Sequence, residues 1–417
     1  MLSQKFLKLP RFNYWFISSL IISSIVCIPL IVISTSFFGE ISGYYKLLKD
    51  TYLYLYIFNT LALLIGVLVL TFIFGVGSAY LVSFYKFPGS TFFTWALILA
   101  FAVPGYIYAY SLTAFFEYFG NLYSILKFIF GEGNYNDYIP RIDSLLGSVF
   151  SISFSLFVYV YLITRACFIY QSQSQIDAGK NMGFSNYQIF KRILLPSARP
   201  GIVAGLSLVA MECVSDFGTV AFFNVQSLTT AIYDSWIIFD DINTAYQLSF
   251  FLIIFIFIFF AIEKKSRSRS RFNIPSRGYR TVEKIKLNGK IKWLVFSVLF
   301  MLFFFSFIFP VSQMLFWILK FPNNFNFINL LDLTLNTCKL VLFTTIILIL
   351  LSFITNYGMR ISESKFLNVV TSFSVSGYAI PGIILAVTLL GFISFVSNYF
   401  NNDGLKIFFI GTVFGLI

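Results

Sequence analysis

Glu212, Asp216 and Tyr233 place oxygen ligands within an apolar part of the sequence, MECVSDFGTVAFFNV followed by TTAIYDSW. An α-helix would put Glu212 and Asp216 on one face, because the two residues are four positions apart. Carboxylate and phenolate oxygens are ligands that hard metal cations prefer. The three side chains are therefore a candidate transient site for such a cation, without the ligand set of a stable metal centre.

The residue types that are missing exclude several kinds of chemistry. The chain contains no histidine, so histidine metal ligation, histidine proton relays and Ser-His or Cys-His catalysis are excluded. The four cysteines are isolated from one another and form no CxxC motif. No GxxxxGK[ST] sequence is present, so this chain does not hydrolyse ATP through a P-loop. We expect neither an enzyme nor a bound cofactor.

The composition indicates an all-α polytopic membrane protein. Hydrophobic residues make up 58% of the 417 positions and charged residues 11%, whereas a soluble domain is about a quarter charged. A membrane span needs about 20 apolar residues. Ten runs approach that length, the last of them cut short: 14–37, 55–83, 93–116, 145–169, 200–223, 246–262, 291–318, 334–356, 368–395 and 406–417.

The positions of the basic residues predict the orientation. If the N-terminus is cytoplasmic, the loops on the cytoplasmic side hold 22 of the 29 Lys and Arg residues. The opposite loops hold eleven acidic residues, among them Glu117, Asp137 and Asp143. The net charge of +12 is thus explained by the positive-inside rule, and the expected partner is the lipid bilayer, with no nucleic acid.

An internal repeat divides the chain. Asn59-Thr60 recurs as Asn336-Thr337, and the segment around Pro104-Gly105 recurs around Pro381-Gly382, both at an offset of 277 residues. We therefore expect a first transmembrane half over 1–262, a basic cytoplasmic linker over 263–290 and an incomplete second half over 291–417. Lipid headgroup or nucleic-acid binding is the alternative interpretation of the linker.

Each Pro-Gly pair falls inside a predicted span. Proline removes a backbone donor and glycine relaxes the backbone, so the pair breaks the helix. Such a break is tolerated in a membrane where protein or water surrounds it. Pro104 and Pro381 are therefore either structural kinks or, together with Glu212, Asp216 and Tyr233, candidates for lining a translocation pathway. For Glu212 and Asp216, hydrogen bonding to another span and a role at the outer mouth stay open.

A polar loop at 171–196 separates two apolar runs. Ser174 followed by Asp177 is an N-cap signature, as is Ser185 followed by Gln188, and Gly183 suits a helix C-cap with positive φ. Leu195-Pro196 is expected to close the second helix, with Pro200 in the first turn of the next span. The loop is thus predicted to form two short helices joined at Gly183.

The residues of this loop resemble the EAA loop of permeases of binding-protein-dependent ABC importers. The resemblance makes these the candidate ATPase-coupling residues: Asp177, Ala178, Gly179, Gly183, Ile193, Leu195 and Pro196. Asp177 stands where the family usually has Glu, and Gly179 replaces a second Ala, which costs about 1 kcal/mol of helix propensity. In that family the loop sits in a cleft of the cytoplasmic ATPase, so the resemblance implies an ABC ATPase dimer as partner.

The segment after the loop resembles ferric-iron importer permeases, which carry two fused six-span halves. The resemblance implies the fold of a type I ABC importer permease, with about ten of twelve expected spans present. It also implies an inner-membrane subunit that takes ferric iron from a periplasmic binding protein while a separate subunit hydrolyses ATP. Thiamine, an organophosphonate or a polyamine are alternative substrates, and an ion-coupled secondary transporter is the alternative from another class.

The offset of the repeat also predicts where a second coupling loop belongs. Adding 277 to 177–196 gives 454–473, which lies beyond residue 417. We therefore expect this chain to be C-terminally incomplete and to carry one of two coupling loops.

Overall fold

The structure, a computed structural model, describes residues 13–36, 41–118, 120–140, 142–170, 173–268, 283–322, 326–375 and 380–400. By their internal contacts the residues fall into unit 1 (1–40 with 318–417) and unit 2 (41–317). Most of the predicted basic linker, residues 269–282, and the tenth predicted span, 406–417, lie outside the described residues.

Unit 2 is almost entirely helical, with one short pair of parallel strands, Tyr85 opposite Ile285 and Lys86 opposite Lys286. Its elements are α2(Gly43–Thr51), α3(Leu53–Phe84), β1(Tyr85–Lys86), α4(Ser90–Ala96), η1(Leu97–Ala102), α5(Gly105–Phe116), α6(Asn121–Phe130), η2(Asn136–Tyr138), α7(Leu145–Ile169), α8(Gln173–Asn181), α9(Asn186–Ile189), η3(Phe190–Leu194), α10(Leu195–Ser215), α11(Gly218–Phe222), α12(Leu228–Tyr233), η4(Asp234–Ile238), α13(Ile242–Ser268), β2(Ile285–Lys286), α14(Gly289–Phe303), η5(Phe304–Ile308) and α15(Phe309–Lys320), whose last three residues belong to unit 1.

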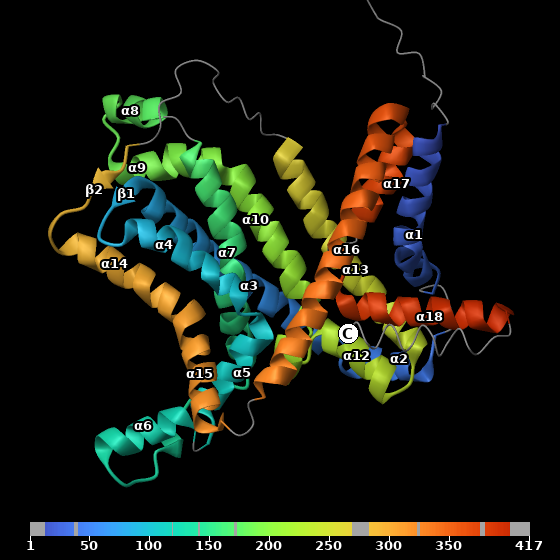
Figure 1. Cartoon of the computed structure of the whole chain (residues 1–417), viewed down its shortest axis with the longest axis horizontal. Coiled ribbons are helices and arrows are strands. Elements are labelled where there is room, and N and C mark those ends of the chain that lie inside the picture. The colour runs from blue at the N-terminus through green and yellow to red at the C-terminus, as the bar shows by residue number, and fades with distance from the viewer. Residues whose placement is uncertain are drawn as a thin grey trace, which may run out of the picture. The chain divides into compact units, whose positions relative to one another are not determined.

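Helix α7 forms the centre of unit 2, with α3 and α10 packed against it (Figure 1). Gly75 of α3 and Gly205 of α10 both lie against Val160 of α7. A Cβ atom at Gly75 would lie 2.6 Å from Val160 Cβ, and one at Gly205 would lie 2.9 Å from Val160 Cα. Small residues allow helix backbones to approach in lipid, where van der Waals packing holds helices together. These two glycines therefore set the spacing of the three central helices.

The Pro104-Gly105 pair breaks the helix in unit 2, as the sequence predicts. A 3₁₀ turn, η1, precedes the pair, and α5 begins at Gly105 directly after it. The two parts together are apolar and long enough for one broken span, with a bend of more than 40° between them. Ser155 Oγ donates to the carbonyl oxygen of Val103 at 2.9 Å, so α7 satisfies a backbone acceptor that the break exposes.

The first Asn-Thr pair of the repeat fastens a turn to α3. Asn59 Nδ2 donates to the carbonyl oxygen of Gln226 at 2.8 Å. Thr60 Oγ1 accepts from the backbone N–H of Leu228 at 3.0 Å, at the start of α12. A polar pair in an apolar helix thus holds the turn that leads to α12.

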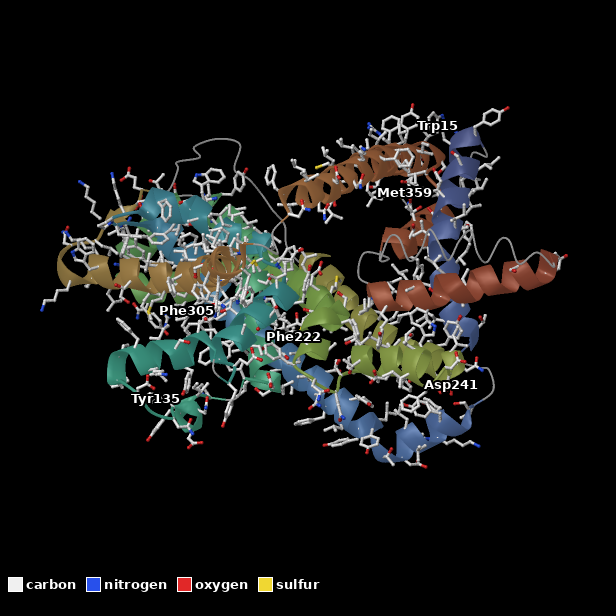
Figure 2. All side chains as sticks on the ribbon, turned by 60° about the horizontal axis from the view of Figure 1, so that its bottom comes forward. Trp15, Tyr135, Phe222, Asp241, Phe305 and Met359 are labelled. Carbon is white, nitrogen blue, oxygen red and sulfur yellow. The ribbon has the colours of Figure 1, made fainter. Side chains whose placement is uncertain are left out.

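Unit 1 contains α1(Tyr14–Ser36), α16(Phe327–Ser362), α17(Lys365–Val375) and α18(Gly382–Phe400). Helix α1 packs on the other three helices. Ser19 Oγ of α1 donates to the carbonyl oxygen of Ile354 at 3.0 Å, and the Trp15 and Tyr357 rings meet edge to face with their centroids 4.7 Å apart. Figure 2 shows Trp15 on α1 beside the segment of α16 that carries Met359.

The predicted count of about ten spans is not confirmed. Five helices are long and apolar enough to cross a membrane: 53–84, 145–169, 186–215, 289–320 and 327–362. The broken pair around Pro104 raises the number to six among the described residues. Helices α1 and α13 contain shorter apolar segments at 14–28 and 242–258, and the predicted span 368–395 falls on α17 and α18. The span predicted at 200–223 is also shifted, since α10 ends at Ser215.

Candidate functional site

The polar loop at 171–196 folds as two helices joined at Gly183, as predicted. Helix α8 begins at Gln173, so the predicted N-cap residue Ser174 lies within the helix. Helix α8 ends with a pair of backbone hydrogen bonds in which Phe184 N donates to Gly179 O and Gly183 N donates to Lys180 O. This is a Schellman motif, which needs a left-handed residue, and Gly183 has φ +76°. Ser185 and Gln188 then form the predicted capping box at the start of α9.

The expectation that Leu195-Pro196 closes the second helix is wrong. The helix runs without a break from Asn186 to Ser215 and includes both prolines. A π-turn, η3, precedes Pro196, and Ser197 Oγ donates to the carbonyl oxygens of Ile193 and Leu194 at 2.7 and 3.0 Å. The π-turn and the serine re-satisfy backbone groups near the prolines, so the helix continues into the membrane segment.

Helix α8 has one buried and one exposed face. Its buried side chains include Gln173 and Ile176, and Gly179 faces α9 and η3 so closely that a Cβ there would lie 2.7 Å from Ile193 Cδ1. Ala178 lies on the opposite, exposed face. Met182, at the end of α8, is 61% exposed and Tyr187 of α9 is 68% exposed. The helix pair thus leaves an alanine and two large apolar side chains available for a partner.

Residues outside the predicted loop hold α8 in place. Gln173 Nε2 donates to Asp177 Oδ1 at 2.9 Å, and Gln173 Oε1 accepts from the backbone N–H of Glu283 at 3.0 Å. Glu283 lies two residues before β2, the strand that pairs with β1 at the end of α3. Partial burial and the nearby Arg165 and Lys86 charges lower the pKa of Lys284 in the same segment. The last part of the predicted linker is therefore attached to the loop, and several positive charges gather at this end of unit 2.

Replacing Gln173 with alanine should weaken the attachment of residues 283–287 to α8. The substitution removes the acceptor for the Glu283 N–H and the donor to Asp177, so the amides of residues 283–287 should exchange with solvent faster. Hydrogen exchange followed by mass spectrometry measures the change. Gln175 is an exposed glutamine on the same helix, and Gln175→Ala should leave the exchange of that segment unaltered. Equal effects of both substitutions would contradict the attachment through Gln173.

Asp216 is placed differently from the expectation that it shares a helix face with Glu212. Helix α10 ends at Ser215, and Asp216 has ψ 110°, outside the helical region. Its Oδ1 accepts from the backbone N–H of Thr219 at 2.8 Å, and its Oδ2 accepts from Thr219 Oγ1 at 2.6 Å. The carboxylate thereby caps the first turn of α11, a local contact that differs from the predicted alternative of hydrogen bonding to another span.

Asp216 and the Pro104-Gly105 break do meet, although they were predicted from separate patterns. A Cβ atom at Gly105 would lie 2.8 Å from Thr219 Oγ1 and 3.2 Å from Asp216 Oδ2. The Tyr233 ring packs on Phe217, with a centroid separation of 4.7 Å. Among the described residues, no group of three or more His, Cys, Asp or Glu side chains is arranged to hold a metal ion. Pro381 lies in unit 1, immediately before α18, and its role stays a proposal.

Substitution of Asp216 separates a structural from a pathway role. Asp216→Ala removes both acceptors for Thr219 and should cost about 1 kcal/mol of stability, as the loss of a helix cap does. Asp216→Asn keeps one acceptor, so its unfolding temperature should be close to that of the unmodified protein. If Asp216→Asn nonetheless abolishes uptake, the charge itself is required. Asp240→Asn is the matched control, because Asp240 is exposed and asparagine tolerates its positive φ of 50°.

Sequence reasoning missed three contributors to these sites. Gln173 and Glu283 are 110 residues apart and carry no pattern that links them. Thr219 carried a weak signal, since an Asp three residues before a Thr matches an N-terminal cap. The contact of Gly105 with Thr219 depends on the fold alone.

The helical fold, with long apolar helices and a broken span, is that of a polytopic membrane protein. Residues 71–272 match the family described as "Binding-protein-dependent transport system inner membrane component". The chain thus carries a permease domain of that family, the ABC importer permeases, and this domain contains the helix pair α8–α9, Asp216 and the Pro104-Gly105 break.

Curated relatives share this part of the sequence at low identity. The chain is 24% identical to the Fe(3+)-transport system permease protein FbpB 2 of Haemophilus influenzae over 191 residues, 46% of this chain and 33% of the relative. It is 23% identical to the sulfate transport system permease protein CysT of Escherichia coli over 155 residues, 36% of this chain and 51% of the relative. The matches therefore span only about a third to a half of these relatives.

Among solved structures, the chain is similar to a bacterial alginate ABC transporter in complex with an alginate pentasaccharide-bound periplasmic protein. That similarity has a TM-score of 0.48 and 16% sequence identity, and it covers 62% of this chain and 94% of that chain.

Proposed function

We propose that the protein is the membrane permease subunit of an ATP-driven importer, and that a separate ATPase dimer binds the helix pair α8–α9. The observation that carries the proposal is the exposed face of this pair, where Ala178, Met182 and Tyr187 project from a turn fixed by Gly183. Apolar side chains exposed on a polar loop suit a protein partner better than water. The domain family supports the same assignment.

The proposed orientation places α8 and the N-terminus on the cytoplasmic side of the inner membrane and α6 on the periplasmic side. Figure 1 shows α8 and α6 at opposite ends of the helices of unit 2. Arg165, Lys86, Lys284 and Lys286 gather at the α8 end, in agreement with the positive-inside rule. A periplasmic binding protein would then deliver substrate at the α6 end.

Ferric iron is the substrate that we propose first. Glu212, Asp216 and Tyr233 supply hard oxygen ligands, and one relative is named as a ferric-iron permease. The carboxylate of Asp216 is already shared with Thr219, so any contact with the ion would be brief, as translocation requires. The relative named for sulfate transport makes an oxyanion the main competing substrate, ahead of thiamine or a polyamine.

The function is tested in ATP-loaded vesicles that hold the permease with its ATPase. Binding protein carrying ferric iron is added outside, and accumulated iron is measured with and without internal ATP. We expect accumulation that needs both ATP and binding protein. Sulfate or 2-aminoethylphosphonate uptake in place of iron would correct the substrate. Uptake driven by an ion gradient without ATP would replace the importer with a secondary transporter.

A further inference from the structure

An apolar cavity of about 420 Å³ lies in unit 2 between α3, α7 and the continuous helix that α14 and η5 form. Its lining residues fall within 73–81 of α3 and 298–305 of α14 and η5, together with Phe154 of α7. Ser78 is the polar side chain of this lining, and its Oγ already donates to the carbonyl oxygen of Phe74 at 2.5 Å. The lining therefore suits an apolar occupant.

The cavity opens on the surface of membrane-spanning helices. Helices 53–84 and 289–320, which form two of its walls, are each long and apolar enough to cross a membrane. Ile73, Val298 and Met301 of its lining are 54%, 51% and 58% exposed. Apolar cavities exclude water, and the hydrocarbon around such helices consists of lipid acyl chains. An acyl chain is therefore the occupant that the lining and its position both favour.

Lysines gather where the α3 and α14 walls of the cavity are joined. Helix α3 continues into β1, which pairs with β2 shortly before α14 begins (Figure 1). This pairing sets Lys86 opposite Lys286. The chain from 283 to 292 holds four lysines and one glutamate. An excess of positive charge thus lies at the end where the two walls come together.

Lys290 lies on the face of α14 that lines the cavity. Leu294 and Val298 follow it at intervals of four residues and Met301 after three more, a spacing that puts all four on one helix face. Val298 is about 12 Å along the helix from Lys290, which is less than half of the hydrocarbon thickness of about 30 Å. Trp293 is 56% exposed, as suits a residue at the membrane interface. A lipid headgroup at Lys290 would thus extend its acyl chain along the cavity.

Charge, more than apolar contact, selects the kind of lipid. An acyl chain gains little by leaving the bilayer for an apolar cavity, because lipid tails are as apolar as leucine. Lysines near the membrane surface attract anionic headgroups, and basic pockets between transmembrane helices bind them. An anionic phospholipid satisfies both ends of this site, whereas a zwitterionic one has no net charge for the lysines to attract.

We propose that the cavity holds one acyl chain of an anionic phospholipid whose headgroup lies on Lys286 and Lys290. The site goes beyond the proposed transport function and does not depend on it, since binding is measured without nucleotide, ATPase or binding protein. Failure of the lipid test therefore leaves the importer assignment unchanged, and failure of uptake leaves the lipid site unchanged.

The test is photolabelling of the full chain in phosphatidylcholine nanodiscs by phosphatidylglycerol that carries a diazirine in one acyl chain, followed by peptide mass spectrometry. We expect label at 73–81 and 298–305 at least fivefold above that at Ile254 and Ile258, exposed residues of α13. Ordinary phosphatidylglycerol should compete, and added phosphatidylcholine should not. Equal labelling of the three segments, or equal competition by the two lipids, would indicate unselective bilayer contact and overturn the proposal. A second copy or another segment of the chain over the cavity would leave 298–305 unlabelled, which would also overturn it.

Two pairs of lysine variants test the headgroup contact. Lys286→Gln with Lys290→Gln should lower the labelling of 298–305 at least threefold. Lys180→Gln with Lys191→Gln is the matched control, because it removes the same charge from exposed residues at the α8 end of unit 2, outside the lining. Undiminished labelling in the first pair, or an equal loss in both pairs, would contradict a headgroup site at these lysines.

Gly77→Leu tests the cavity itself. A Cβ atom at Gly77 meets no atom within 4 Å, so leucine enters the cavity without displacing the backbone. Labelling of 298–305 should fall at least threefold, while the unfolding temperature in micelles should not fall, since leucine is the better helix former. Undiminished labelling of this variant would place the acyl chain outside the cavity and refute the proposal.

Discussion

Replacing Ala178 with arginine should weaken the association of the protein with the proposed ATPase dimer. Ala178 is exposed at the centre of the outward face of α8, so the larger side chain meets no neighbour within the chain. Arginine is also a good helix former, and α8 should fold normally. In the complex, however, the added bulk and charge would fall on the surface that docks, which we expect to weaken binding roughly tenfold or more.

The measurement is co-purification of the ATPase, followed by ATP hydrolysis in reconstituted vesicles. Asn288→Arg is the matched control, because Asn288 is exposed at the same end of unit 2 and its side chain forms no cap hydrogen bond with α14. It adds the same charge outside the helix pair. Normal ATPase binding by Ala178→Arg would contradict the proposed docking face, whereas loss of binding in both variants would indicate a general charge effect.

Replacing Gly75 with valine should disrupt the packing of α3 on α7. The new Cβ would lie 2.6 Å from Val160 Cβ and 3.0 Å from the carbonyl oxygen of Phe157, and a backbone atom cannot move aside as a flexible side chain can. Overpacking of this kind costs about 1–3 kcal/mol. The helices next to Pro104 and Asp216, α5 and α10, pack on α7, so the proposed uptake should fall together with stability.

Gly77→Val provides the comparison within one turn of the same helix. A Cβ at Gly77 meets no atom within 4 Å, so the same change in residue type should leave the unfolding temperature in micelles nearly unchanged. Both variants replace one glycine of α3 with valine, so the change in helix propensity is the same in each and cancels when the two are compared. Equal destabilisation of the two would mean that contact with Val160 does not set the helix spacing.

Local features of the coupling loop could be predicted from the sequence. The left-handed Gly183 and the Ser185 capping box depend on residues within a few positions of one another, and both are present. The prediction that the helix ends at Pro196 was wrong, because a π-turn and the Ser197 hydroxyl compensate for the missing backbone donor. A proline is tolerated inside a membrane helix where neighbouring groups satisfy the backbone groups that it frees.

The arrangement of the candidate pathway residues, in contrast, could not be predicted from the sequence. Helical spacing placed Glu212 and Asp216 on one face, but the helix ends between them and Asp216 turns to Thr219. Nothing in the spacing of 104–105 and 216–219 predicts that these segments touch, because only the packing of α5 and α11 on α7 brings them together. Long-range pairs such as Gln173 with Glu283 could not be predicted from the sequence for the same reason.

The π-turn η3 sets the rotational phase between the coupling helix pair and the membrane. One extra residue in a turn offsets the helix beyond it by about 100°, the angle between successive residues of an α-helix. The packing of Gly205 against Val160 fixes α10 beyond this turn, and Gly179 of α8 contacts Ile193, which lies within the turn. The direction in which Ala178 faces relative to α10 is thus decided at residues 190–194, and a change of register there would both turn the proposed docking face and move Ile193 relative to Gly179.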